Sequence, residues 1–240
     1  MRAIFVGIEY AGKSTLIGLL DAYYRRRSLD PHLDDHFTIP DATLSPSSQT
    51  VALTLPDDMK ERTQRMQIHY HLDIIRMYEH VLVAGWHIEE AVYTAMYGDD
   101  PDSPYYKPYH YIFQRHYEGK LLKEELPGLV LVHVTASDEA IRQRMREHPH
   151  EHQVIREQHI GELKRHFDEE VIKSLLVVGR HHIELDTTGK TPQQSLDQLL
   201  GLSEPLIGTA ELAIRSLPVP DGDYEVRYEN GVRRMVAKGG

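Results

Sequence analysis

A short glycine-bounded segment near the start of the chain has the residue types that bind phosphate. Residues 7–14 (Gly-Ile-Glu-Tyr-Ala-Gly-Lys-Ser) match the pattern G-x-x-x-x-G-K-[ST] at every fixed position. The glycines let the backbone curl, so that successive N–H groups point at phosphate oxygens in front of a helix N-terminus. In this pattern Lys13 reaches the β- and γ-phosphates, and the hydroxyl of Ser14 ligates Mg²⁺. The residues expected to bind a nucleoside triphosphate here are Gly7, Tyr10, Ala11, Gly12, Lys13, Ser14 and Thr15.

The elements on either side of this loop are those that the pattern requires. Residues 2–6 are a short apolar run, which predicts a buried strand. Apolar residues recur at helical spacing from Lys13 to Arg27, and the arginines at 25–27 suit a helix C-terminus. A strand, a glycine loop and a helix in this order distinguish a phosphate loop from a chance match.

The rest of the chain alternates between predicted strands and predicted helices. Strands are expected at 31–37, 80–86, 129–134 and 181–185, and helices at 59–79, 87–96, 105–122, 138–147, 154–173 and 192–200. Residues 38–57 are rich in proline, serine and threonine, and are interpreted as a loop with a strand at 50–55. The alternation indicates βαβ units and therefore an α/β, three-layer P-loop fold around a mostly parallel, five-stranded sheet.

Composition limits what else the chain can bind. Its 240 residues carry 27 Lys and Arg against 37 Asp and Glu, and the net charge of -10 argues against nucleic acid as the main partner. The chain has no cysteine, which excludes disulfides and thiolate chemistry. No apolar run approaches the roughly 18 residues of a membrane span, and the first residues lack a signal-peptide pattern. A cytoplasmic protein with no membrane partner is expected.

Two further stretches give the chain a resemblance to a known family. Residues 131–146 (LVHVTASDEAIRQRMR) follow a strand with an arginine-bearing helix, and residues 183–191 (IELDTTGKT) end a strand before another helix. With the phosphate loop and the order of elements, they resemble the nucleoside and nucleotide kinases, thymidylate kinase in particular, as far as about Leu200. The Asn-Lys-x-Asp stretch that GTPases use to read the base is absent. The resemblance implies ATP and Mg²⁺ as cofactors and a nucleoside or nucleoside monophosphate as the small-molecule phosphoryl acceptor.

The resemblance also assigns roles to residues of the two stretches. In these kinases, lid arginines reach over the phosphates and neutralise charge in the transition state. Arg142, Arg146 and Arg156 are the candidates here. Arg144 is expected to point elsewhere, because Arg142 and Arg146 are four residues apart and share a helix face that Arg144 does not. The loop after the last strand packs against adenine in such folds, which assigns Thr188 and Gly189 to the nucleotide.

One part of the family's pattern is missing. Thymidylate kinases carry Asp-Arg-Tyr after the third strand, where the aspartate helps to hold Mg²⁺ and the arginine grips the acceptor phosphate. Residues 84–87 of this chain are Ala-Gly-Trp-His instead. We expect Glu89 or Glu90 to replace the carboxylate from the next helical turn. The arginines that could bind the acceptor from the preceding helix are Arg62, Arg65 and Arg76.

Polar and aromatic side chains at two strand ends are candidates for the acceptor site. Asp34 and Asp35 end the second predicted strand, where open α/β sheets bind ligands. A carboxylate there can accept the hydroxyl proton of the acceptor, and the alternation of strand side chains favours Asp35 alone for that role. Trp86 ends the third strand and can stack on a ring of the acceptor. The competing interpretations are a solvated acidic turn for the aspartates and core packing for Trp86.

The organisation of the chain changes after about residue 202. Residues 1–202 are expected to form the P-loop kinase domain, with a lid at about 142–158. Residues 203–240 predict an extension with a helix at 204–217 and a β-hairpin around Asn230-Gly231. So small a hairpin is expected to pack on the core or on a second subunit, which makes a homodimer possible. Two other functions stay open: a P-loop kinase that acts on a non-nucleotide hydroxyl, and a P-loop NTPase switch that gates a protein partner.

Overall fold

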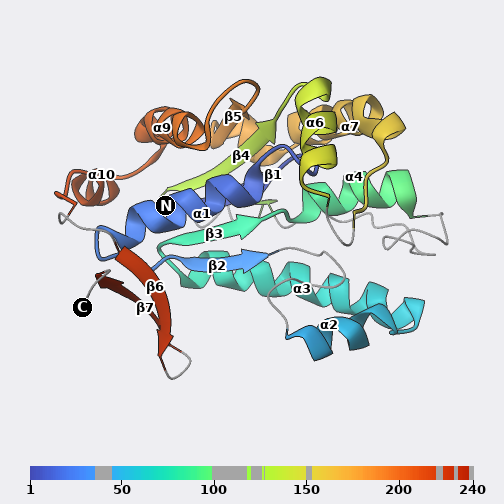
Figure 1. The fold of residues 1–240 in the computed structure, drawn as a ribbon, viewed down its shortest axis with the longest axis horizontal. Helices are drawn as coiled ribbons and strands as arrows, with labels where there is room; N and C mark the ends of the chain where they lie inside the picture. Colours follow the sequence, from blue (N-terminus) through green and yellow to red (C-terminus); the bar gives the residue numbers. More distant parts are fainter. Residues whose placement is uncertain are drawn as a thin grey trace.

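A computed structural model describes residues 1–35, 45–98, 118–119, 126, 128–149, 153–219, 224–229 and 232–237. Strands and helices alternate through most of this length (Figure 1). Within these ranges, no helix combines the length and the apolar character needed to cross a lipid bilayer.

Five parallel strands form the central sheet. They are β1 (Arg2–Val6), β2 (His32–Asp35), β3 (Val81–Ala84), β4 (Leu129–Thr135) and β5 (His182–Asp186), in the order β2-β3-β1-β4-β5. β1 is buried along its whole length and pairs with β3 on one side and β4 on the other. Parallel neighbours need crossover connections, and these connections contain the helices. The predicted α/β class and the parallel five-stranded sheet are confirmed.

Helices cover both faces of the sheet. They include α1 (Lys13–Arg25), α3 (Asp57–Met77), α4 (His87–Tyr97), α6 (Asp138–Glu147), α7 (Ile160–Ile172), α8 (Leu175–Val178) and α9 (Pro192–Ser203). Asp34 contacts α3, and His133 contacts α7. In the strand register, Asp34 lies level with Val83, Ile4 and Leu131, so these side chains point to one face of the sheet. Leu131 and His133 are two residues apart on β4 and share that face, so α3 and α7 cover the same face. α1 packs against α9 and lies on the other side of β2 and β3 from α3 (Figure 1).

The structure corrects two predictions about the elements between β2 and β5. Residues 46–53 form helix α2 (Pro46–Leu53), not a loop with a strand at 50–55. The hydroxyl of Ser45 accepts the N–H of Ser48. Pro46 lies in the first turn, where the backbone N–H that proline lacks would have no partner within the helix. α7 begins at Ile160 after a 3₁₀ turn (η1, Glu157–His159), so the helix predicted at 154–173 is shorter. Apart from residues 118–119, the helix predicted at 105–122 lies outside the described residues.

The predicted C-terminal helix is also divided, while the hairpin is present. A 3₁₀ turn (η2, Glu204–Leu206) and helix α10 (Thr209–Arg215) replace one helix at 204–217, because Pro205 and Gly208 interrupt it. β6 (Tyr224–Glu229) and β7 (Val232–Ala237) form an antiparallel pair with Glu229 opposite Val232. The hairpin lies at the opposite end of the molecule from α6 (Figure 1).

A buried polar cluster ties α10 to the start of the chain. The Glu211 carboxylate accepts hydrogen bonds from the Met1 amine at 2.8 Å and from the Tyr24 hydroxyl, and His80 Nδ1 lies 3.2 Å from it. Arg215 donates to the Tyr24 hydroxyl at 3.1 Å. Burial alone would raise the pKa of Glu211, but the bonds from His80 and the amine outweigh it and hold the pKa well below its ordinary value. The carboxylate therefore stays charged and anchors α10 to Met1 and Tyr24.

We predict that His133 makes the stability of the fold depend on pH. Its ring lies over Phe167 with centroids 6.4 Å apart, and burial, aided by the nearby charges of His182 and Lys13, lowers its pKa from 6.5 to about 4. The unfolded chain takes up this proton first as the pH falls below 6.5, so the stabilisation present at neutral pH is lost between 6.5 and 4. Between pH 7.5 and 5 the loss should be about 2 kcal/mol.

The measurement is urea unfolding of the protein and of His133→Leu at both pH values. The other titrating groups are shared, so their contribution cancels when the two pH-dependent losses are compared. Between pH 7.5 and 5, the free energy of unfolding of His133→Leu should fall by about 2 kcal/mol less than that of the original protein. Equal losses in the two proteins would contradict the prediction.

Candidate active site

The phosphate loop joins β1 to α1, and its backbone explains its glycines. Gly7 has φ +145° and Gly12 has φ +101°, which are conformations that L side chains rarely adopt. A Cβ on Gly7 would lie 2.0 Å from the carbonyl oxygen of Val134, so no side chain fits there. Gly12 is the N-cap of α1, which has no side-chain cap and no acidic residue in its first turn. An N-terminus of this kind fits an anionic ligand.

Lys13 and Glu89 form an ion pair against this loop. Lys13 Nζ lies 3.2 Å from Glu89 Oε1 and donates to the carbonyl oxygens of Gly7 and, at 3.2 Å, Ile8. Glu89 also accepts the N–H of Gly7 at 3.2 Å. It lies in the first turn of α4, directly after β3, where a carboxylate is stabilised by the helix dipole. Of the two glutamates expected to replace the missing aspartate, the structure brings Glu89 to the loop.

Two carboxylates with perturbed pKa values lie near the Lys13 ammonium. Burial raises the pKa of Glu89, and the charge of Lys13 and the N–H of Gly7 oppose the rise. Burial also raises the pKa of Glu9, opposed by Lys13 and by the N–H groups of Ile155 and Val154. Paired titratable groups in such settings are typical of catalytic sites. Sequence reasoning missed Glu9, although it is the only acidic residue between Gly7 and Thr15.

The segment that follows α6 folds back onto the phosphate loop. The Glu9 carboxylate accepts the N–H groups of Val154 and Ile155 at 3.3 and 3.4 Å, and the Tyr10 hydroxyl donates to Gln153 at 2.9 Å. The N–H of Arg156 donates to the Tyr97 hydroxyl of α4 at 3.4 Å. Residues 153–156 belong to the predicted lid, and here they close against the loop.

The arginine of α6 that reaches the loop is Arg144, which the sequence predicted to point elsewhere. Its Nη1 donates to the carbonyl oxygen of Tyr10 at 2.8 Å and to Thr187 Oγ1 at 3.1 Å. Its Nη2 donates to the carbonyl oxygen of Thr187 at 3.2 Å. Burial lowers the pKa of Arg144, and the charge of Asp186 opposes that change. The guanidinium thus joins the phosphate loop to the loop after β5.

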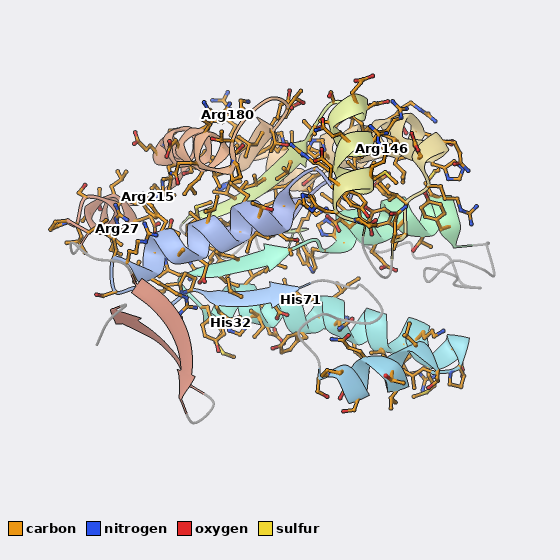
Figure 2. The ribbon with its side chains drawn as sticks, in the orientation of Figure 1. Arg27, His32, His71, Arg146, Arg180 and Arg215 are labelled. Atoms are coloured by element: carbon orange, nitrogen blue, oxygen red, sulfur yellow. The ribbon has the colours of Figure 1, made fainter. Side chains whose placement is uncertain are left out.

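The three arginines predicted to act on the phosphates have other surroundings. Arg142 lies 3.9, 3.9 and 3.5 Å from the carboxylates of Asp138, Glu139 and Glu157. Arg146 is exposed near the end of α6 (Figure 2). The guanidinium carbon of the exposed Arg156 lies 5.9 Å from the centroid of the Tyr97 ring. Spacing correctly separated Arg144 from the other two arginines of α6, but it did not determine which face α6 turns to the loop.

The loop after β5 lies beside the phosphate loop, as its predicted role in nucleotide binding requires. Thr187 Oγ1 donates to the carbonyl oxygen of Ala11 at 2.7 Å. The Thr188 hydroxyl accepts the N–H of Ser137 at 2.7 Å and donates to Asp186 at 2.6 Å. Gly189 has φ +66°, which suits the turn that leads into α9.

The acceptor candidates after β2 and β3 lie in different surroundings. Asp34 faces α3, because its Oδ1 lies 3.3 Å from Nε2 of the buried His71, and its Oδ2 lies 3.8 Å from His32 (Figure 2). The backbone of Asp35 pairs with Ala84, while its side chain is outside the described part of the structure. Trp86 is fully buried and packs edge-on against the His87 ring, with centroids 4.3 Å apart. This burial favours the core-packing interpretation of Trp86, and its contact with an acceptor stays a prediction.

The arginines of α3 were the remaining acceptor candidates. Arg62 is exposed, and Arg76 lies 3.6 Å from Asp73 of the same helix. The side chain of Arg65 lies outside the description. The role of these arginines in acceptor binding stays a prediction.

Comparison with known proteins finds solved structures with a similar fold. No protein-family model matches the sequence, and no curated protein matches it significantly. Thymidylate kinase from Candida albicans superimposes with a TM-score of 0.55 at 16% identity, over 98% of this chain and 97% of the other. The YorR protein of Bacillus subtilis, in complex with phosphorylated GDP, gives 0.55 at 14% identity, over 84% and 95%. Deoxyadenosine kinase from M. mycoides with bound dATP gives 0.54 at 13% identity, over 84% and 98%.

These similarities span nearly the whole of each known structure and at least 84% of this chain. At such identities they report backbone architecture rather than site chemistry. The chain therefore has the α/β P-loop kinase fold that thymidylate kinase and deoxyadenosine kinase share, as its motifs and element order predict.

Proposed function

We propose that this protein is a kinase that transfers the γ-phosphoryl group of Mg²⁺-bound ATP to a nucleoside or nucleoside monophosphate. The observation that carries the proposal is the position of Lys13. Its ammonium lies between the carbonyl oxygens of the phosphate loop and the buried Glu89, next to the uncapped N-terminus of α1. Positive charge and backbone N–H groups then converge on one point, as phosphate binding requires.

The residues around Lys13 have the chemistry to hold a magnesium ion. Ser14 is exposed in the first turn of α1 and offers a hydroxyl, and Glu89 offers a carboxylate at the same loop. Mg²⁺ prefers oxygen ligands of these two kinds and keeps several waters. When bound, it would neutralise charge that develops on the transferring phosphoryl group.

The chain's own residues would act mainly by positioning the nucleotide and by stabilising charge. Lys13 would bind the β- and γ-phosphates in exchange for its contacts with the loop carbonyls. Arg144 and Thr187 hold the two nucleotide loops in register. Glu89 or Asp35 would accept the proton of the acceptor hydroxyl, or orient a water on the metal.

ADP release from Mg²⁺-ATP, measured against a panel of nucleosides, nucleoside monophosphates and other hydroxylated small molecules, tests the proposal. Strong stimulation by one nucleoside or monophosphate is expected. Stimulation only by a sugar or another non-nucleotide hydroxyl would contradict the proposed substrate class. Slow hydrolysis that no acceptor stimulates would contradict the proposed reaction.

Substitution of Lys13 tests whether the phosphate loop is the site of the reaction. Lys13→Ala removes the ammonium of the phosphate loop and should lower acceptor-dependent turnover by about 10²- to 10³-fold. Lys173→Ala is the matched control, because that exposed lysine pairs with Glu170 at the end of α7. Initial rates at saturating acceptor would show the effect. Equal rates for Lys13→Ala and the control would exclude the phosphate loop as the site of the reaction.

The two carboxylate candidates can be distinguished by neutral, isosteric variants. Glu89→Gln keeps the shape but removes the charge that pairs with Lys13, and turnover should fall by about 10²-fold or more. If Asp35 accepts the acceptor proton, Asp35→Asn should also lower turnover, but with little change in ATP affinity. Steady-state kinetics with both substrates varied separates these effects. Full activity in Glu89→Gln would refute its place in the site.

The new assignment of Arg144 has its own test, with Arg142 as the control. Arg144→Ala removes three half-buried hydrogen bonds and should reduce the free energy of unfolding by about 2 kcal/mol and weaken ATP binding several-fold. Arg142→Ala removes only ion pairs that water reaches, so it should change the free energy of unfolding by less than about 1 kcal/mol. Chemical denaturation and nucleotide titration measure both quantities. A larger effect of Arg142→Ala would show that the lid arginines were correctly chosen from the sequence.

A further inference from the structure

Tyr97 is the last residue of α4 and is almost fully buried, yet its hydroxyl contacts a distant segment of the chain. The N–H of Arg156 donates to this hydroxyl at 3.4 Å, and Nδ1 of His159 lies 3.2 Å from it. The N–H of His159 also donates to the carbonyl oxygen of Arg156 at 2.9 Å, which closes a turn. Burial raises the pKa of Tyr97, so the hydroxyl keeps its proton and can accept one bond while it donates another. One side chain therefore holds both ends of the turn at 156–159.

The ring of Tyr97 also lies next to the side chain of Arg156. The guanidinium carbon is 5.9 Å from the ring centroid, within the range of a cation–π contact. Such a contact is weak when the cation is exposed to water, as the Arg156 side chain is. A hydrogen-bonded contact with a phosphate, by contrast, is among the strongest that arginine makes. The ring is therefore a place from which a bound phosphate can draw the guanidinium.

The residues before Arg156 bind the phosphate loop directly. The Glu9 carboxylate accepts the N–H groups of Val154 and Ile155, at 3.3 and 3.4 Å. Arg156 is the next residue, so its backbone is held by the loop on one side and by the hydroxyl at the end of α4 on the other. Arg142, another arginine predicted to act on the phosphates, lies instead among three carboxylates. Arg156 is thus the better placed of the two to reach a phosphate at the loop.

We propose that Tyr97 is a positioning residue: its hydroxyl holds the backbone of Arg156 beside the phosphate loop, and its ring holds the guanidinium until a nucleotide phosphate takes it over. This inference rests on the proposed function, which supplies the phosphate. An arginine that is already positioned loses less conformational entropy when it binds its anion, so the anion binds more tightly. Tyr97 acts through Arg156 and does not contact the nucleotide itself.

Trypsin cleavage after Arg156 tests the hydroxyl contact without any catalytic readout. A protease needs an extended substrate, so the initial rate reports the fraction of molecules in which the turn at 156–159 is open. Tyr97→Phe keeps the ring and removes the hydroxyl, and cleavage should become roughly three- to tenfold faster. Mass spectrometry identifies the fragment 1–156, and circular dichroism confirms that the variant is folded. An unchanged rate would overturn the proposal.

Tyr23→Phe is the matched control, because Tyr23 has the same kind of surroundings elsewhere in the molecule. Its hydroxyl donates to the carbonyl oxygen of Arg215 at 3.4 Å, and the guanidinium carbon of Arg27 lies 3.7 Å from its ring centroid. Arg27 lies at the opposite end of the molecule from Arg146 of α6 (Figure 2). Tyr23→Phe should therefore leave cleavage after Arg156 unchanged, and equal acceleration by both variants would overturn the proposal.

A double-variant cycle tests whether Tyr97 acts through Arg156. Tyr97→Phe and Arg156→Ala should each weaken the binding of a non-hydrolysable ATP analogue with Mg²⁺ by roughly three- to tenfold. The double variant should bind no more weakly than Arg156→Ala alone, because the hydroxyl then has no arginine to position. A merely structural role of Tyr97 would weaken binding again by a similar factor. That additive result, or unchanged affinity in Arg156→Ala, would overturn the proposal.

The same titrations separate this inference from the proposed function. Full coupling of the two substitutions in a protein that no acceptor stimulates to release ADP would contradict only the proposed reaction. Acceptor-stimulated ADP release with additive effects on analogue binding would contradict only the role of Tyr97. An original protein that does not bind the analogue would refute both.

Discussion

The Lys13–Glu89 ion pair is the interaction on which the arrangement of the site depends. It joins the first turn of α1 to the first turn of α4, and through the N–H of Gly7 it also holds the end of β1. Both side chains are largely removed from water, where an unpaired charge would be destabilising. The pair therefore fixes the distance between the phosphate loop and the end of β3, the two places where the proposed reaction would bring together a phosphoryl donor and its acceptor.

Other contacts extend this constraint to the parts of the site that close over it. Arg144 links the carbonyl oxygen of Tyr10 to Thr187, and Glu9 holds the N–H groups of Val154 and Ile155. Residues 153–156 and the loop after β5 are thus both held against the phosphate loop, the former through the Glu9 side chain and the latter through the carbonyl oxygen of Ala11. Because the contacts of Arg144 and Thr187 end on the carbonyl oxygens of Tyr10 and Ala11, they depend on the loop conformation that Gly7 and Gly12 allow.

The sequence predicted the framework well because the framework follows from local patterns. The phosphate loop, the five strands and most helices are specified by glycine spacing and by apolar periodicity. The differences have two origins. The proline-rich segment became α2 through a local signal that the composition did not reveal, namely Ser45 as the cap and Pro46 in the first turn. The side of α6 that faces the loop, and hence the choice of Arg144 over Arg142, depends on packing that spacing does not encode.

Phosphate binding at this loop requires Lys13 to exchange its present partners for the nucleotide. A crystal structure of the protein with Mg²⁺ and a non-hydrolysable ATP analogue measures this exchange. We predict that the β- and γ-phosphates lie in front of the N-terminus of α1, and that Lys13 Nζ leaves the carbonyl oxygens of Gly7 and Ile8 to contact them, with Glu89 still at the loop. A nucleotide bound elsewhere, or a Lys13 that keeps its contacts while the phosphates lie outside the loop, would contradict the account.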